Sequence, residues 1–267
     1  MFNSGEYNLR VTAASISASV LMAGMAALSG AEAGEAEAKS LLKAMSDYMG
    51  SQQSMSFTYD SSFEVVTKDQ QKLQLTSSGA VALSRPDKIV ATRHGGFADV
   101  AMMFDGKTLT VLGKDANVYA QTEVPGSVEN LVDELRDKLH RPLPAADLLL
   151  ANTYDVLMAD VTDVKDLGSG IVGGLECDHL AFRTPEVDWQ IWIAQGDKPY
   201  PCRYVISTKT VDLSPQYTIQ VGDWKTGSDA TASFEFKNET GATKIEFSKL
   251  GEADLDELPK HFSGGAQ

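Results

Sequence analysis

The sequence predicts an α+β domain built mainly from one antiparallel β-sheet, with helices over one face of the sheet. Segments in which apolar and polar residues alternate recur from residue 56 to residue 248, and this alternation is the period of half-buried strands. Turn-forming pairs such as Asp105-Gly106 separate these segments, so consecutive strands are expected to pair as hairpins. Helical spacing interrupts the alternation only at the start and in the middle of the chain, which favours helices laid over the sheet rather than a second domain.

The first expected element is a helix over residues 35–50. Gly50 suits the end of this helix, because glycine readily adopts the backbone conformation that terminates one. The apolar residues that fall on one helical face are Ala38, Leu41, Leu42, Met45, Tyr48 and Met49.

Six strands are expected to follow the first helix. In the first of them, Phe57, Tyr59, Phe63 and Val65 alternate with polar residues. The expected bounds are Ser56–Val66, Lys72–Ser84, Lys88–His94, Ala98–Phe104, Thr108–Leu112 and Val118–Thr122.

Helical segments are expected between residues 127 and 159. Ser127 is a suitable N-cap for a helix that runs to about His140, and the prolines of residues 141–144 end it. Shorter helical pieces are expected at Ala145–Ala151 and Asp155–Ala159.

The alternation then resumes in six further segments, and about ten or eleven of the twelve candidate segments are expected to form strands. The glycines at 168, 170, 173 and 174 are interpreted as bends that let a sheet curl, since no Lys-Ser/Thr follows them as a phosphate loop requires. The expected strands are Glu176–Thr184, Asp188–Ala194, Arg203–Thr210, Thr218–Trp224, Ser233–Lys237 and Lys244–Ser248.

Residues 1–33 are interpreted as a secretion signal. A cation, Arg10, precedes a stretch of apolar and small residues from Val11 to Leu28, and Ala31-x-Ala33 fits the rule for signal peptidase cleavage after Ala33. The alternative is an N-terminal membrane anchor, although the stretch is short for a span of about 20 strongly apolar residues. The expected products are the signal at 1–33 and one periplasmic domain at 34–267, with no integral membrane segment after cleavage.

The charge of the chain limits its partners. The formal net charge is −14, and removal of residues 1–33 leaves 234 of the 267 residues with a charge of −13. Nucleic acid is not expected as a partner, because phosphates require clustered lysine and arginine. Adsorption of the whole surface to anionic lipid headgroups is disfavoured for the same reason.

Cys177 and Cys202 are the two cysteines of the chain, and their pairing is left open. Export to an oxidising compartment favours a disulfide. The two residues are expected near the starts of the first and third strands of a meander, where alternate strands lie about 9–10 Å apart. A disulfide therefore requires the middle strand to end before it reaches the space between the two cysteines. The alternative is a pair of buried thiols.

No pattern in the sequence predicts a catalytic residue, a metal ligand or a cofactor site. The four histidines lack metal-ligand spacing, and no G-x-S-x-G nucleophile motif occurs. His179 beside Cys177 is interpreted as structural, and Asp188 beside Trp189 as the start of a strand followed by a core residue. The protein is therefore expected not to be an enzyme.

The runs CDHLAFR at 177–183 and DWQIWI at 188–193 resemble a family of predicted periplasmic proteins of unknown function in the LolA/LolB-like superfamily. Supporting runs are PAADLLL at 144–150, YDVL at 154–157 and GKTL at 106–109. The resemblance covers roughly residues 35–250. It implies an unclosed antiparallel β-barrel of about eleven strands, with helices over an apolar concave face.

The implied fold leads to three functional hypotheses. The first is a periplasmic carrier or binding protein that holds the acyl chains of a lipid or lipoprotein in the half-barrel. The second is an envelope protein-interaction module with a filled core and no small ligand, and the third is a hydrolase with an unrecognised carboxylate or histidine site. For the first hypothesis, the expected cavity-lining residues are Phe57, Tyr59, Phe63, Leu75, Met102, Phe104, Trp189 and Trp192.

Overall fold

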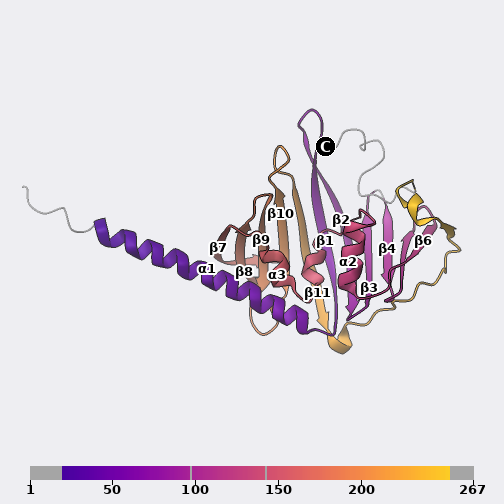
Figure 1. Ribbon diagram of the computed structural model, residues 1–267, viewed down its shortest axis with the longest axis horizontal. Helices are drawn as coiled ribbons and strands as arrows, with labels where there is room; N and C mark the ends of the chain where they lie inside the picture. The colour runs from indigo at the N-terminus through magenta and orange to yellow at the C-terminus, as the bar shows by residue number, and fades with distance from the viewer. Residues whose placement is uncertain (1–19, 97, 142, 253–267) are drawn as a thin grey trace, which may run out of the picture.

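A single β-sheet dominates the computed structural model, which describes residues 20–96, 98–141 and 143–252 (Figure 1). Within those residues the sheet has twelve strands. The first six are β1 (Ser54–Val66), β2 (Lys72–Ser84), β3 (Lys88–Gly95), β4 (Asp99–Phe104), β5 (Thr108–Gly113) and β6 (Val118–Glu123). The others are β7 (Asp163–Val172), β8 (Leu175–Arg183), β9 (Val187–Ala194), β10 (Pro201–Thr208), β11 (Gln216–Thr226) and β12 (Thr243–Ile245).

The strand order is β12-β6-β5-β4-β3-β2-β1-β11-β10-β9-β8-β7. Two antiparallel meanders, β1–β6 and β7–β11, therefore join where β11 pairs with β1. The short strand β12 pairs with β6 in the parallel direction. Because β12 and β7 stand at opposite ends of this order, the sheet is unclosed, and the predicted fold class is confirmed with twelve strands instead of about eleven.

Strand β7 was not expected, because its glycines were interpreted as bends. Its register against β8 shifts between Asp166 and Ser169, and Gly168 in that interval has φ +81°. A bulge of this kind uses a glycine inside a strand without ending it.

The predictions for the last two strands were wrong in part. Ser233–Lys237 contains no strand, and its Phe236 instead packs its ring 4.7 Å from that of Tyr119 on β6. Within Lys244–Ser248, only the first two residues belong to β12, and the 3₁₀ helix η3 (Phe247–Glu252) follows. An alternating sequence indicates that every second side chain contacts the core. An extended loop that lies along a sheet can have the same pattern without pairing with a strand.

The first helix, α1 (Val20–Ser51), begins earlier than the expected residue 35. It therefore includes the end of the predicted signal, whose alanine-rich sequence favours helix; residues 1–19 lie outside the described residues. Among the described residues, no helix is long and apolar enough to cross a membrane. The predicted face is confirmed by Ala38, Leu42, Met45 and Met49, which are buried on the sheet.

Three short helices follow β6: α2 (Val128–Asp137), the 3₁₀ helix η1 (Ala146–Leu149) and α3 (Thr153–Met158). The predicted cap is confirmed, since Ser127 Oγ accepts a hydrogen bond of 3.3 Å from the backbone N–H of Asn130. The last turn ends before the expected His140, which has φ +52° and cannot continue an α-helix. In Figure 1, α2 and α3 lie over the same face of the sheet as α1.

The two halves of the sheet are covered differently. Helix α1 packs against β7 and β9, where Trp189 stacks on Phe182 at 3.9 Å within the buried core. The half formed by β1 to β5 lies under α2, η1 and the segment between them, and side chains leave space there.

Candidate functional site: an apolar cavity under the short helices

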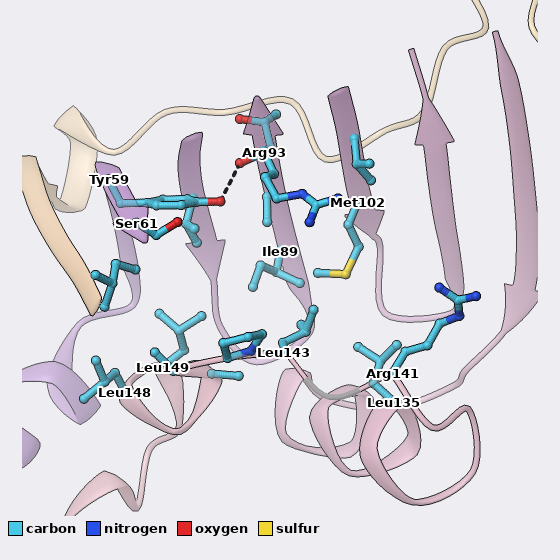
Figure 2. A pocket seen from close by; sticks show the side chains of 18 of the residues that line it. Tyr59, Ser61, Ile89, Arg93, Met102, Leu135, Arg141, Leu143, Leu148 and Leu149 are labelled. Carbon is cyan, nitrogen blue, oxygen red and sulfur yellow. Dashed lines mark hydrogen bonds between the residues drawn. The ribbon is translucent and has the colours of Figure 1, made fainter. Parts of the chain in front are cut away.

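A cavity of about 610 Å³ lies between the sheet and the short helices (Figure 2). One wall consists of side chains from β1 to β5 and β11, and the opposite wall consists of α2, η1 and the residues that join them; Met49 of α1, Pro201 of β10, and Phe247 and Leu250 of η3 also line the cavity. Most of the lining side chains are apolar. The volume lies in the range of about 300–1,000 Å³ that holds drug-sized ligands and cofactors.

Strand register arranges the sheet wall in rows that cross β1 to β5. The inner row is Met55–Leu83–Ile89–Phe104–Leu109. The middle row is Phe57–Val81–Ala91–Met102–Val111, and the outer row is Tyr59–Gly79–Arg93–Val100–Gly113. Side chains two residues apart share a sheet face, so successive rows are about 7 Å apart along the strands.

Burial decreases from the inner row to the outer row. Every residue of the inner row is at most 2% exposed. All five residues of the middle row line the cavity. The side chains of the outer row, Tyr59, Arg93 and Val100, also line it and are half-buried. The cavity is therefore closed and apolar at the inner row and more exposed at the outer row.

Tyr59 forms part of this outer row because Gly79 leaves room for its ring. A Cβ at Gly79 would lie 2.7 Å from the Tyr59 ring and would overlap the carbonyl oxygen of Thr92. In the absence of a side chain at position 79, the Tyr59 hydroxyl crosses β2 and donates a 3.0 Å hydrogen bond to that carbonyl oxygen (Figure 2). The glycine thus positions an aromatic ring in the cavity wall.

Arg85 connects the sheet to the helical wall. It follows β2, and its Nη1 donates to Glu129 of α2 at 3.2 Å, while its Nη2 donates to the carbonyl oxygen of Leu149 at 2.8 Å. Burial lowers the pKa of Arg85, and the charge of Glu129 opposes that shift. One side chain therefore holds both α2 and η1 against the sheet.

The charged residues that line the cavity are basic. They are Arg93 on β3, and Arg141 with the neighbouring His140 in the segment after α2. The described residues of the lining contain no aspartate and no glutamate. Asp147 stands between two lining residues of η1, and burial raises its pKa, so its environment disfavours the charged form.

Three of the eight residues expected to line a cavity, Phe57, Tyr59 and Met102, do line it. Phe63 and Leu75 share the face of Tyr59 but pair with each other farther along the β1–β2 hairpin. Phe104 belongs to the buried inner row, beneath the cavity. Trp189 is buried in the core where it stacks on Phe182, and Trp192 stacks on His179 at 4.0 Å.

The sequence predicted helices over an apolar concave face but did not identify their side chains as cavity-lining residues. Leu135, Leu139, Leu143, Leu148 and Leu149 contribute to the helical wall. Their helical spacing and the prolines around Leu143 predicted short helices over the sheet but not which of their side chains would face a cavity. Arg93 was also missed, because one cation in an alternating strand resembles any solvated residue.

The sulfur atoms of Cys177 and Cys202 lie 2.6 Å apart, and both residues are thiols in this structure. Cys177 is on β8 and Cys202 is on β10, with β9 between those strands. The two meet because β9 ends at Ala194, the residue opposite Cys177, and because the β9–β10 register shifts between Pro201 and Arg203. Burial raises the pKa of both thiols, which disfavours a reactive thiolate.

The other residues considered for chemistry have structural partners. The Nε2 of His179 lies 2.9 Å from the amide oxygen of Gln190. Arg183 donates to both carboxylate oxygens of Asp188, at 2.7 and 2.8 Å, and lowers its pKa. The described residues contain no cluster of histidine, cysteine and carboxylate side chains suited to a metal ion.

Comparison with protein families gives a match over residues 38–248 to the family described as "Predicted periplasmic protein (DUF2092)". The chain belongs to this family. The match confirms the resemblance inferred from the runs at 177–183 and 188–193. No curated protein matches the sequence significantly.

Solved structures similar to this DUF2092 chain are distant in sequence. LprF from Mycobacterium bovis is 13% identical, with a TM-score of 0.44 over 75% of this chain and 96% of that one. The lipoprotein LppX from Mycobacterium tuberculosis is 12% identical, with a TM-score of 0.38 over 75% and 100% of the two chains. A LolA superfamily protein, NE2245 from Nitrosomonas europaea, is 12% identical, with a TM-score of 0.31 over 72% and 94%.

Proposed function

We propose that this protein is a non-catalytic periplasmic binding or carrier protein that holds the acyl chains of a lipid or lipidated ligand. The chain would be exported in a Gram-negative bacterium by the signal at residues 1–33, cleaved after Ala33, to leave one domain at 34–267. The family description as a predicted periplasmic protein supports this compartment. The ligand would leave water for the space between the sheet and the short helices.

The cavity of about 610 Å³ is the observation that carries the proposal. Its inner end rests on a row of fully buried apolar side chains, and its middle row contributes Phe57, Val81 and Met102. Transfer of a methylene group from water to such surroundings is worth about 0.8 kcal/mol. An acyl chain with several buried methylenes would therefore bind without a specific polar contact.

The cavity also weighs against the filled-core alternative, in which the protein is only an interaction module. Side chains leave an open space under α2 and η1, and Met49 at the end of α1 also lines it. Protein interiors are normally packed without voids larger than a water molecule, so an apolar space of this size favours a ligand.

Two neighbouring methionines provide a matched test of the proposal. Met102 points into the cavity, whereas Met103 lies on the opposite face of β4. We expect Met102→Trp to fill the space and lower the affinity for a fluorescent fatty-acid probe by at least about tenfold. Met103→Trp should leave the affinity nearly unchanged.

Probe titration of the purified mature protein measures both affinities. Mass spectrometry of lipids extracted after native purification gives an independent measurement of bound ligand. Binding that survives in Met102→Trp, with the variant folded by circular dichroism, would show that the cavity is not the acyl site. Absence of probe binding and of co-purified lipid would overturn the proposed function.

A further inference from the structure

We infer that the cavity selects an amphiphile with an acidic headgroup, and that Arg93 contacts this headgroup at the outer row. The inference rests on the proposed function, because it identifies the chemical class of the acyl ligand. The shared chemistry is an alkyl or acyl chain that ends in a carboxylate or a phosphate.

The first argument is the sign of the charges in the lining. The whole chain has a formal net charge of −14. The described lining nevertheless includes Arg93 and Arg141, together with His140, and none of the acidic residues that predominate elsewhere. Figure 2 shows Arg93 on the sheet wall and Arg141 on the helical wall, both directed toward the cavity. Among the described residues, the charged side chains of the lining are therefore basic in a chain that is acidic overall.

The second argument is the gradient of polarity along the strands. The inner and middle rows are apolar throughout, and the outer row introduces the Tyr59 ring and the Arg93 guanidinium. One row beyond, Ser61 and Ser77 face each other and their hydroxyls are 2.9 Å apart. Ser61 also lines the cavity. An amphiphile has the same order of chemistry, with an apolar chain and a polar end.

The third argument is the place of Arg93 in this order. Its side chain is half-buried at the point where the apolar wall gives way to the polar row. A guanidinium presents planar donors that match a carboxylate or phosphate in a bidentate arrangement. Partial burial strengthens such a contact relative to one in bulk water. Arg93 is thus placed to bind a headgroup whose chain extends to the inner row.

Amphiphiles with the same twelve-carbon chain and different headgroups test the inference. Dodecanoate and dodecyl phosphate are the anionic probes, dodecyltrimethylammonium is the cationic probe, and dodecyl maltoside is the neutral probe. Each displaces a fluorescent fatty acid from the mature protein below its critical micelle concentration. We expect both anions to bind at least about tenfold more tightly than the cation, and the preference to weaken at high salt.

Variants of β3 assign the preference to one side chain. Arg93→Gln is expected to weaken binding of the anions by about tenfold and to leave dodecyl maltoside unchanged. Arg93→Lys should retain most of the preference, because it retains the charge. Lys88→Gln removes the same charge from the opposite face of the same strand and should have no effect.

The outcomes separate this inference from the proposed function. Suppose that the anions, the cation and dodecyl maltoside bind with equal affinity, and that Met102→Trp abolishes the binding of each. The protein would then bind acyl chains without selecting for charge, so the inference would be overturned and the proposed function would stand. Full anion affinity in folded Arg93→Gln would also overturn it. A stronger loss for dodecyl phosphate than for dodecanoate in Arg93→Gln would support the inference and assign the headgroup as a phosphate.

Discussion

At the scale of single residues, Gly79 decides the position of Tyr59 in the cavity wall. We predict that Gly79→Ala lowers the free energy of unfolding by about 1–3 kcal/mol, because the new Cβ would overlap the Thr92 carbonyl oxygen and the Tyr59 ring. Gly95→Ala on the next strand is the control, since its Cβ would be 3.6 Å from the nearest atom. Urea denaturation measures both variants, and equal effects would contradict this explanation.

The cysteine pair gives a second prediction at this scale. In an oxidising compartment, Cys177 and Cys202 are expected to lose two protons and two electrons to a disulfide oxidant and to form a bond. Reduction should then lower the free energy of unfolding by about 3 kcal/mol, since the bond closes a loop in the unfolded chain. Thiol titration under denaturing conditions measures the bond. Two free thiols in protein isolated from the periplasm would refute it, and the double variant to alanine should not respond to reductant.

At the scale of elements, the helical wall depends on Arg85. We predict that Arg85→Met exposes the segment from α2 to η1 to faster hydrogen exchange and accelerates release of a bound acyl probe. The reason is that the variant removes the donors to Glu129 and to the Leu149 carbonyl oxygen, and so leaves those acceptors partly buried without their partner.

Arg136→Met is the matched control for this prediction. Arg136 is an exposed arginine of α2 whose carboxylate partners, Asp133 and Asp137, lie on the same helix. Its removal should leave the hydrogen exchange of the wall nearly unchanged, because exposed ion pairs within one helix contribute little. Equal acceleration of hydrogen exchange in Arg85→Met and Arg136→Met would contradict the prediction that the contacts of Arg85 hold the helical wall.

At the scale of the whole molecule, one unclosed sheet supports two different interiors. Helix α1 buries its apolar face on one half, where Phe182 and Trp189 stack. Helices α2 and η1 stand over the other half and leave the cavity. Under the proposed function, we expect α2 and η1 to move to admit a ligand while the half under α1 keeps its packing, because those helices are short and joined by loops.

The sequence by itself determined the fold class, most strand bounds and the family. Period-two alternation is a local property, so β2 was predicted with its observed bounds, and Ser127 was predicted as a cap from its position alone. The same reasoning failed at β7, where glycines in a bulge resemble a loop.

Only the tertiary structure decided which apolar residues enclose a space and which fill the core. Met102 and Phe104 are alternate residues of one strand, yet the first lines the cavity and the second is fully buried. Their difference depends on which residues from distant parts of the chain pack over each row. The meeting of Cys177 with Cys202 and the place of Arg93 in the wall depend in the same way on where neighbouring strands end and pair, because contacts between distant segments follow from packing and not from local period.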